Sequence, residues 1–343
     1  MQTEKKQTIP YLQWLRAAAA AAVVVMHTEG EVWFSISHDS APWRVLTLYD
    51  GLVRWPVILF IMITGALFLP RRTTLSAVLK RYIPRLMVAW VFWAGIYALL
   101  ALAGGTAPAD AWMKFITGEY HMWYIPFLCG LYLTIPFLQP IAEDDRLTLQ
   151  LLAVAGVIGL VIPWTADLTA LLFPGWSGLV RSIEGSLNFS FFFDHLAILV
   201  LGHWLHSHEL PRRARHLLYA AGIAGLLLTG PATIWASGRA GLQNSLFCDI
   251  AAPNNLCTAA ALFVFAKRHL HRLPKAVAHL ARCSFGVYLS HVLIIELLAR
   301  GGITALTGDP VWMLPVLSAA VLAVSWALSA ILGRLPVLGR YLA

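Results

Sequence analysis

Long apolar stretches are the feature that most constrains how this chain folds. A helix needs about 20 apolar residues to cross the hydrocarbon core of a bilayer, and stretches of that length recur along the 343 residues. The runs are continuous rather than alternating, which argues against a membrane β-barrel. We predict an all-α, polytopic membrane helix bundle of about ten transmembrane helices, formed by residues 1–343 as a single domain. The expected spans are 10–28, 51–69, 86–104, 122–141, 147–164, 186–205, 217–236, 249–266, 283–299 and 312–332, with an apolar re-entrant or interfacial segment at 165–185.

Composition supports the same class of protein. Apolar residues make up 59% of the chain and charged residues 12%, and the mean hydropathy is +0.70. A soluble domain carries about 25% charged residues, so a water-soluble surface and a disordered chain are both excluded.

The four cysteines lack a metal-binding spacing. We therefore expect them to be small core residues, and we predict no metal site.

The distribution of basic residues predicts the orientation of the bundle. With the N-terminus in the cytoplasm, 18 of the 25 Lys and Arg residues fall in inner segments and six in outer ones, while Arg16 lies within the first span. Such an inner excess is the signature of cytoplasmic loops. We expect cytoplasmic N- and C-termini in a multi-pass protein of the bacterial inner membrane. The net charge of +8 is then a topology signal and indicates no nucleic-acid partner.

Arg16 and His27 form the sharpest pair of polar residues in an expected span. At 100° per residue, the step of eleven residues from Arg16 to His27 returns the helix to within about 20° of the same direction, so both side chains share one face. They lie about 16 Å apart along the axis. Ionisable groups inside a membrane are costly and usually mark function. The alternatives are that Arg16 extends to the inner headgroups and that His27 is a hydrogen-bonded buried or interfacial histidine.

Two further groups of polar residues lie in or beside the expected spans. Glu119, His121 and Trp123 lie at the outer start of the fourth span, and Tyr288 and His291 lie in the ninth. An imidazole near the middle of the membrane needs a partner. We interpret these five residues as candidate substrate-binding residues. The alternatives are an aromatic belt at the membrane interface for the first group and an interhelical hydrogen bond for His291.

The sixth expected span also carries polar residues, Asn188, Asp194 and His195. Adjacent residues of a helix point apart, so Asp194 and His195 cannot form a local pair and each needs a partner elsewhere. The pattern leaves a structural and a functional role equally open.

The loop after the second span holds the densest basic stretch of the predicted cytoplasmic side. Arg71, Arg72, Arg81 and Arg85 lie in it. Guanidinium groups match phosphate oxygens in pairs, so these four arginines are candidate binding residues for a soluble cofactor that carries several phosphates. The alternative is a topology signal that also attracts anionic lipids.

Four motifs stand in order along the chain: Arg16-x10-His27 after YLQWLR (11–16), FIMITGALFL (60–69), HMWYIP (121–126) and SFGVYLSH (284–291). Together with the basic loop after the second span, they resemble the acyltransferase-3 superfamily of integral membrane acyltransferases. The resemblance covers about residues 10–300. Three departures stand out: Ala17 where the family commonly has Gly, Thr64 where it has Ser, and a basic R-x-x-R pattern stretched to Arg81-x3-Arg85.

The resemblance implies an acetyl-CoA-dependent O-acyltransferase that acts on a hydroxyl of a glycan or polyprenyl-linked sugar. It implies that His27 serves as general base or transient acyl carrier and that Arg16 stabilises the donor or the oxyanion. Two other classes of protein fit the spans and the buried charges. One is a secondary transporter or flippase of a lipid-linked sugar, although paired spans broken by Gly or Pro are not visible. The other is a partner-dependent membrane scaffold.

Overall fold

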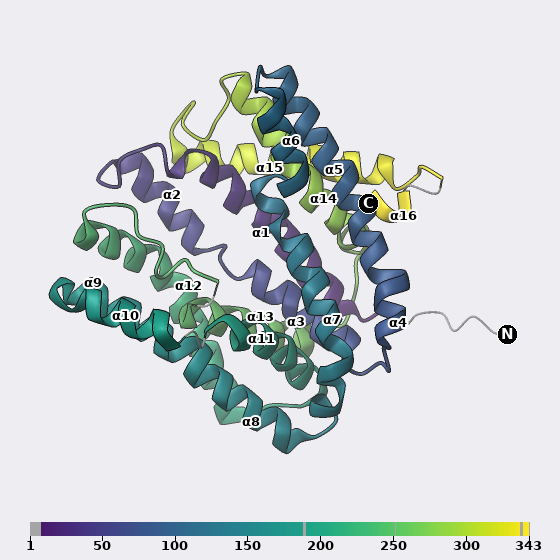
Figure 1. Cartoon of the computed structure of the whole chain (residues 1–343), viewed down its shortest axis with the longest axis vertical. Coiled ribbons are helices and arrows are strands. Elements are labelled where there is room, and N and C mark those ends of the chain that lie inside the picture. Colours follow the sequence, from purple (N-terminus) through teal and green to yellow (C-terminus); the bar gives the residue numbers. More distant parts are fainter. Residues whose placement is uncertain (1–7, 188–189, 251, 337–338, 343) are drawn as a thin grey trace.

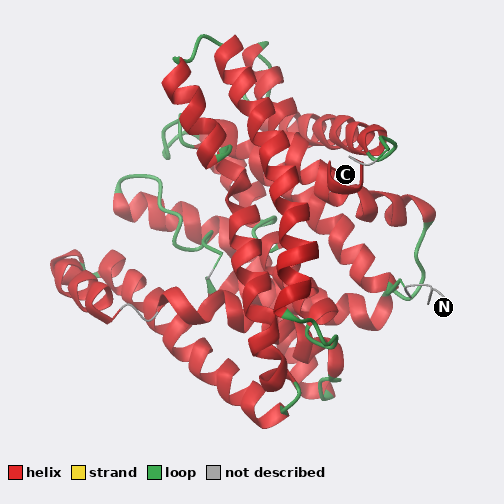
Figure 2. Cartoon of the chain, turned by 45° about the vertical axis from the view of Figure 1, so that its right-hand side comes forward, coloured by secondary structure: helices red, strands yellow, loops and turns green. Residues whose placement is uncertain are grey.

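The computed structural model describes residues 8–187, 190–250, 252–336 and 339–342. These residues form helices and loops without a strand (Figure 2), which confirms the all-α prediction for this part of the chain. The α-helices are α1 (Pro10–Trp33), α2 (Ala41–Gly51), α3 (Pro56–Phe68), α4 (Leu75–Ala77), α5 (Ile83–Ala103), α6 (Pro108–Thr117), α7 (Tyr124–Ala142), α8 (Asp145–Ala155), α9 (Ile162–Leu172), α10 (Ser177–Leu187), α11 (Ser190–Ser207), α12 (Arg212–Ala240), α13 (Pro253–His269), α14 (Lys275–Arg300), α15 (Pro310–Leu332) and α16 (Gly339–Leu342). Two π-helical segments, η1 (Val78–Tyr82) and η3 (Gly156–Val161), and two 3₁₀ segments, η2 (Tyr120–Trp123) and η4 (Pro174–Trp176), connect them.

Seven helical stretches in the described residues are long and apolar enough to cross a membrane. They are Ala41–Phe68, Leu75–Ala103, Pro108–Ala142, Asp145–Leu172, Arg212–Ala240, Lys275–Arg300 and Pro310–Leu332. The chain is therefore a multi-pass membrane protein. The three other expected spans fall on α1, α11 and α13, which carry more polar residues. The count of ten spans and the cytoplasmic position of both termini stay predictions.

Helix α1 lies at the centre of the bundle (Figure 1). It packs against α14, α3, α15, α2 and α13. Its middle is a run of alanines followed by valines, 17–25, and such small side chains allow neighbouring helices to approach closely. Leu12 and Leu15 join the main apolar core together with Leu59 of α3 and Trp93 of α5. A central helix shielded by its neighbours can carry polar side chains that lipid would not tolerate.

The second expected span is interrupted. The sequence predicts one helix over 51–69, whereas the structure has α2 and α3 separated by residues 52–55. Proline lacks an amide hydrogen and is accepted at the first position of a helix, so Pro56 begins α3 rather than continuing α2. Arg54 lies in this interruption.

Two glycines bring α3 and α11 into close contact. A methyl group added at Gly65 would overlap the carbonyl oxygen of Leu199, and one added at Gly202 would overlap the backbone of Met62. Small residues at a crossing allow backbones to approach in membranes. Gly65 therefore fixes how α3 and α11 pack.

Segment 165–185 lies in α9, η4 and α10. In Figure 1, α9 and α10 lie at the edge of the bundle. Its interfacial or re-entrant placement stays a prediction.

Candidate active site

The structure brings His27 and His291 together, although 264 positions separate them in the sequence. They lie in helices that pack side by side, α1 and α14. The Nδ1 atom of His27 is 3.0 Å from the Nε2 atom of His291, and the ring centroids are 4.8 Å apart. His291 is fully buried and His27 only partly. Of the two imidazoles, His27 is therefore the one that a substrate can reach.

The hydrogen bonds of this pair set which ring nitrogen carries the proton. Nδ1 of His291 faces the Val287 carbonyl oxygen at 3.1 Å, and Nδ1 of His27 faces that of Val23 at 3.0 Å. A carbonyl oxygen only accepts, so each Nδ1 atom carries a proton and His291 Nε2 accepts from His27 Nδ1. This assignment leaves Nε2 of His27 unprotonated, with its lone pair available for chemistry.

His121 completes a cluster of three imidazoles. Its ring centroid lies 5.2 Å from that of His291 and 6.1 Å from that of His27. The hydroxyl of Tyr288 donates to the His121 carbonyl oxygen at 2.7 Å and so holds η2 against α14. His121 is 1% exposed, and neither ring nitrogen has a hydrogen-bond partner within the described part of the chain. Buried polar atoms are normally paired, so these nitrogens are available to a bound substrate.

Tyr97 of α5 supports the cluster and was not singled out by the sequence. Its hydroxyl donates to the Leu289 carbonyl oxygen at 2.9 Å and accepts from the Leu293 amide at 3.0 Å. These two backbone groups, four residues apart, would otherwise bond to each other within α14. The Tyr97 ring also lies 5.4 Å from that of His121. A tyrosine deep in an apolar span needs a hydrogen-bond partner for its hydroxyl. The position of Tyr97 within the expected span 86–104 could therefore have marked it as a residue that contacts another helix.

Arg16 lies on the same face of α1, nearer its N-terminal end. Its guanidinium is within electrostatic range of Arg85 from α5 and of the Tyr124 and Tyr132 phenols from α7. Across the described ranges, no carboxylate forms an ion pair with Arg16 or Arg85. Two neighbouring cations without a counter-charge repel each other. The arrangement therefore favours binding of an anion between them.

A row of aromatic rings connects the arginines with the histidines. Near the arginines, the ring centroids of Tyr82 and Tyr132 are 5.8 Å apart. Tyr124, which like Tyr132 is close to Arg16, lies 6.1 Å from Tyr288. Tyr288 in turn lies 5.5 Å from His121. Aromatic side chains of α7 and α14 thus lie between the two polar groups.

The π-helical turn η1 accounts for the stretched spacing of Arg81 and Arg85. A π turn closes its hydrogen bond one residue later than an α turn, so it accommodates one extra residue between two side chains that follow each other along a helix. Both arginines are exposed, and the Arg81 guanidinium carbon lies 5.7 Å from the centre of the Tyr82 ring. The departure from the family spacing therefore has a local structural basis.

Four of the sequence-predicted site residues lie outside this arrangement. Arg71 and Arg72 are exposed in the loop after α3. Trp123 is 42% exposed, and its ring packs against Phe127 rather than a histidine. Glu119 forms an ion pair with Lys114 at 2.6 Å and accepts from the Tyr120 amide at 3.2 Å, which caps η2. Glu119 thus helps to position the turn that carries His121.

Of the three polar residues noted in the sixth span, only His195 has a described side chain. Asn188 lies outside the described residues, as does the side chain of Asp194. The His195 ring packs 4.9 Å from that of Phe127.

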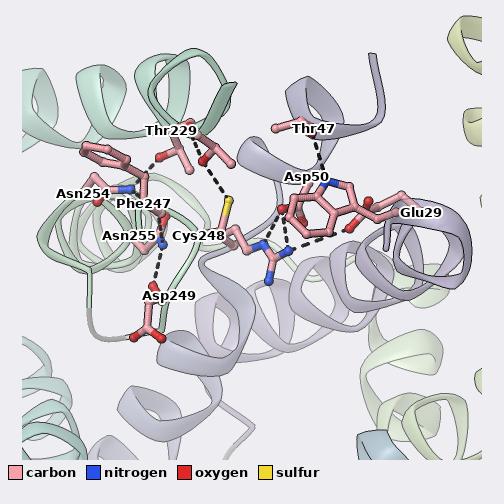
Figure 3. Close-up of polar contacts among 12 residues, drawn as sticks. Glu29, Thr47, Asp50, Thr229, Phe247, Cys248, Asp249, Asn254 and Asn255 are labelled. Atoms are coloured by element: carbon pink, nitrogen blue, oxygen red, sulfur yellow. Dashed lines mark hydrogen bonds and ion pairs between the residues drawn. The ribbon is translucent and has the colours of Figure 1, made fainter. Parts of the chain in front are cut away.

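A second polar cluster, also not singled out by the sequence, lies on another side of α1 (Figure 3). Arg54 forms a two-fold contact with Asp50, at 2.5 and 2.7 Å, and lies 3.8 Å from Glu29. Both carboxylates are buried, at 0% and 1% exposure. Cys248 lies beside Asp50 and Arg54 and is 3.1 Å from the Thr233 hydroxyl. Asp50 and Arg54 are four residues apart beside an apolar run, and this spacing could have indicated an ion pair.

The fold and this arrangement define a multi-pass membrane protein with a buried imidazole cluster and, about 16 Å away along α1, arginines that form no ion pair in the described chain. Residues 9–330 match the family model of the acyltransferase-3 type, described as an acyltransferase domain. The chain therefore belongs to this family and is a membrane acyltransferase. No curated protein and no solved structure matches it. Within the described residues, no group of three or more His, Cys, Asp or Glu side chains could hold a metal ion.

Proposed function

We propose that this acyltransferase moves an acetyl group from acetyl-CoA to a hydroxyl of a cell-surface or lipid-linked glycan. The observation that carries the proposal is the unprotonated Nε2 atom of His27, set by the bonds of Nδ1 to Val23 and His291. Imidazole ordinarily has a pKa of about 6.5. It therefore suits a group that takes a proton and returns it near neutral pH.

The donor end of the site is assigned to Arg16 and Arg85. Coenzyme A carries several phosphates, and paired guanidinium groups bind phosphate through two hydrogen bonds each. Arg81 lies in the preceding turn and adds to the same field. Arg71 and Arg72, exposed after α3, attract the anionic donor toward this surface. The aromatic row then leads the thioester from the arginines toward the histidines.

The reaction places His27 between the two substrates. Nε2 of His27 takes the hydroxyl proton while the acceptor oxygen bonds to the thioester carbonyl carbon. The carbon–sulfur bond then breaks, and the proton passes from Nε2 to the leaving sulfur, so that the products are an acetyl ester and coenzyme A. His291 holds the other nitrogen of His27 throughout. His121, whose ring nitrogens are unpaired, holds the acceptor hydroxyl or the carbonyl oxygen.

The acceptor is proposed to approach from the membrane side opposite to the donor. In the bacterial inner membrane this side is the outer face, where glycans under assembly are attached to polyprenyl lipids. The motifs resemble those of the stand-alone enzyme that O-acetylates enterobacterial common antigen, so a comparable lipid-linked sugar is the proposed acceptor. Glu119 and Trp123 lie near η2 at this end, and Tyr288 borders His121.

The test is transfer of radiolabel by the purified full-length protein. It is incubated with acetyl-CoA and with glycolipids from a strain that lacks the protein. Label in the acetyl group should reach the glycolipid, whereas label in the adenine should stay in solution. Movement of glycolipid across a vesicle without label transfer would overturn the proposal and favour the flippase. Acetyl label that stays on the protein when acceptor is omitted would assign His27 as acyl carrier rather than base.

A further inference from the structure

The last turns of α1 present an open face beyond the proposed base. His27, Gly30 and Glu31 lie within about 100° of one another around the helix, since each residue advances the direction by about 100°. Thr28 and Glu29, on the other side of the helix, are buried. Glu31 is exposed, and His27 and Gly30 are partly exposed. The open face therefore begins at His27 and continues toward the C-terminal end of α1.

Gly30 leaves space on this face. A methyl group added to its Cα atom would meet no atom of the surrounding described residues within 4 Å. Glycine inside a helix is less stable than alanine by about 0.5–1 kcal/mol. At Gly65 a close helix contact accounts for the glycine, but Gly30 has no such contact in the described chain. The space beside Gly30, called the Gly30 space below, is therefore open to a ligand.

Tyr120 of η2 borders the same face of α1. Its ring centroid lies 5.6 Å from that of His27 and 5.7 Å from that of His121. Tyr120 is within electrostatic range of Glu31 as well. Despite these neighbours the side chain is 53% exposed. An aromatic ring that stays accessible next to the proposed base offers a surface on which the apolar C–H face of a sugar can stack.

The turn that carries Tyr120 is fixed in place. Gly118 has φ +74°, a conformation that favours glycine, and a methyl group added there would meet the Trp90 ring at 2.8 Å. The Glu119 side chain accepts from the Tyr120 amide at 3.2 Å. The ring is thus held in position before a ligand arrives, which reduces the entropy lost on binding.

The charges around the Gly30 space are mainly negative. Glu31 is within electrostatic range of Glu119 and Glu296. Lys114 pairs with Glu119 at 2.6 Å, and Arg300 pairs with Glu296 at 2.7 Å. Glu31 forms no ion pair in the described part of the chain. Its carboxylate can accept hydrogen bonds from hydroxyl groups and repels an anionic group.

We propose that the Gly30 space is the subsite for the sugar ring that receives the acetyl group, and that it takes a neutral ring rather than one with a carboxylate or phosphate. Tyr120 stacks on the ring, and Glu31 accepts hydrogen bonds from its hydroxyls. Glu31 lies about 6 Å beyond His27 along the helix, so a ring held between them directs a hydroxyl toward Nε2 of His27. The role in acetyl transfer rests on the proposed function, whereas binding of the sugar does not require transfer.

The first experiment measures binding to the full-length protein in nanodiscs without acetyl-CoA, by saturation-transfer difference NMR. The probes are methyl glycosides of neutral sugars and of uronic acids, with empty nanodiscs as the blank. Neutral glycosides should bind more tightly than methyl glucuronide. Tyr120→Leu, which keeps an apolar side chain without an aromatic face, should raise the dissociation constant of the neutral glycosides at least about tenfold. Tyr120→Phe should recover most of that loss.

A matched pair of variants at Gly30 tests the space itself. Gly30→Phe fills the space and should abolish binding, whereas Gly30→Ala adds one methyl group and should weaken binding by no more than a few-fold. Thermal unfolding of both variants checks that they fold. Trp112→Ala is the control for an exposed aromatic residue, because Trp112 is 63% exposed on α6 and its ring stacks on Phe115 rather than on a histidine.

Glu31→Gln tests the preference for neutral sugars. The amide keeps the size of the side chain and removes its charge, so methyl glucuronide should gain affinity relative to the neutral glycosides. An unchanged ratio would show that Glu31 does not select the sugar and would overturn this part of the proposal.

The outcomes separate this inference from the proposed function. Binding of neutral glycosides that Tyr120→Leu and Gly30→Phe weaken and Trp112→Ala does not would support the subsite, even without acetyl transfer. Wild-type acetyl transfer to glycolipid by a folded Gly30→Phe protein would overturn the subsite and leave the proposed function intact. Absence of neutral binding, tighter binding of glucuronide, or an equal loss in Trp112→Ala would also overturn the subsite.

Discussion

Helix α1 carries two polar clusters that begin only two residues apart and are built in opposite ways. His27 faces α14 and joins imidazole rings, whereas Glu29 lies about 200° around the helix and meets Asp50 and Arg54. The first cluster contains no ion pair in the described chain, and its members bond mostly to backbone oxygens. The second cluster is held together by the ion pairs of Arg54 with Asp50 and Glu29.

The difference between the clusters indicates which of them does chemistry. Arg54 is engaged by two carboxylates at the interruption between α2 and α3, so that cluster fastens one helix end to α1. In the histidine cluster, Nε2 of His27 and both ring nitrogens of His121 are left for a ligand. The charged cluster also leaves Glu29 Oε2 and Asp50 Oδ1 without a hydrogen-bond partner in the described chain, but Arg54 neutralises both carboxylates, whereas no charged group closes the imidazole cluster. This difference favours the histidine cluster as the reactive one.

The largest expected effect is on activity, from His27→Ala. General acid–base catalysis contributes about 10²–10⁴-fold, so acetyl transfer should fall by that factor. The midpoint of thermal unfolding in detergent should stay close to that of wild type, because His27 is only partly buried and its one interhelical hydrogen bond, between neutral groups, contributes about 0.5–1.5 kcal/mol. Transfer at the wild-type rate would exclude His27 as base and as acyl carrier.

The next effect is on stability, from Arg54→Gln. Removing one partner of a buried ion pair leaves unneutralised carboxylates and costs about 3–5 kcal/mol. Thermal unfolding of the purified variant should show this loss. Arg44→Gln, at an exposed position of the preceding helix α2, is the control. A stable Arg54→Gln protein without activity would reverse the comparison and assign chemistry to the charged cluster.

A smaller effect is expected for Arg16→Lys. A charge-assisted hydrogen bond contributes about 1.5–3 kcal/mol, and an ammonium group does not reproduce the fork of a guanidinium. We expect KM for acetyl-CoA to rise and overall transfer to fall by about ten- to a hundredfold. Steady-state kinetics with the donor varied measure this change. Wild-type kinetics would indicate that Arg16 only extends toward the headgroups.

The smallest effect is expected for His291, which acts through His27 as a positioning residue. His291→Leu keeps an apolar core but removes the acceptor for His27 Nδ1, a neutral hydrogen bond of about 0.5–1.5 kcal/mol. The value of kcat should fall by up to about tenfold. His291→Asn, whose amide oxygen can accept the same bond, should recover part of the loss. Equal kcat values for the two variants would show that His291 has a packing role only.

The sequence predicts the relations that lie within one helix and misses most of those between helices. The shared face of Arg16 and His27 follows from helical periodicity alone, and the structure directs both toward α7 and its preceding turn η2. The contact of His27 with His291 depends on how α1 and α14 pack. A local sequence pattern does not show how two distant helices pack. The sequence therefore offered an interhelical hydrogen bond only as one of two interpretations of His291 and did not identify its partner.

The interruption between α2 and α3 shows a second limit. A window of apolar residues predicts a span but does not distinguish a continuous helix from two collinear ones. Asp50 lies just before the expected span 51–69 and Arg54 near its start, and their tertiary partner Glu29 is on another helix. The π turn at η1 is similar, since the spacing of Arg81 and Arg85 shows an extra residue but not where the helix absorbs it.

The close crossing of α3 and α11 changes how loss-of-function variants in the second motif should be interpreted. Gly65 belongs to the stretch FIMITGALFL, one of the motifs that resemble the family, yet its hydrogen atoms face the backbone of Leu199 rather than a substrate. Even an alanine there would push two helices apart and displace the rings that line the donor end. A dead enzyme at this position would report a steric collision, and a mutational scan that ranks residues by activity alone would mistake a structural spacer for a reactant.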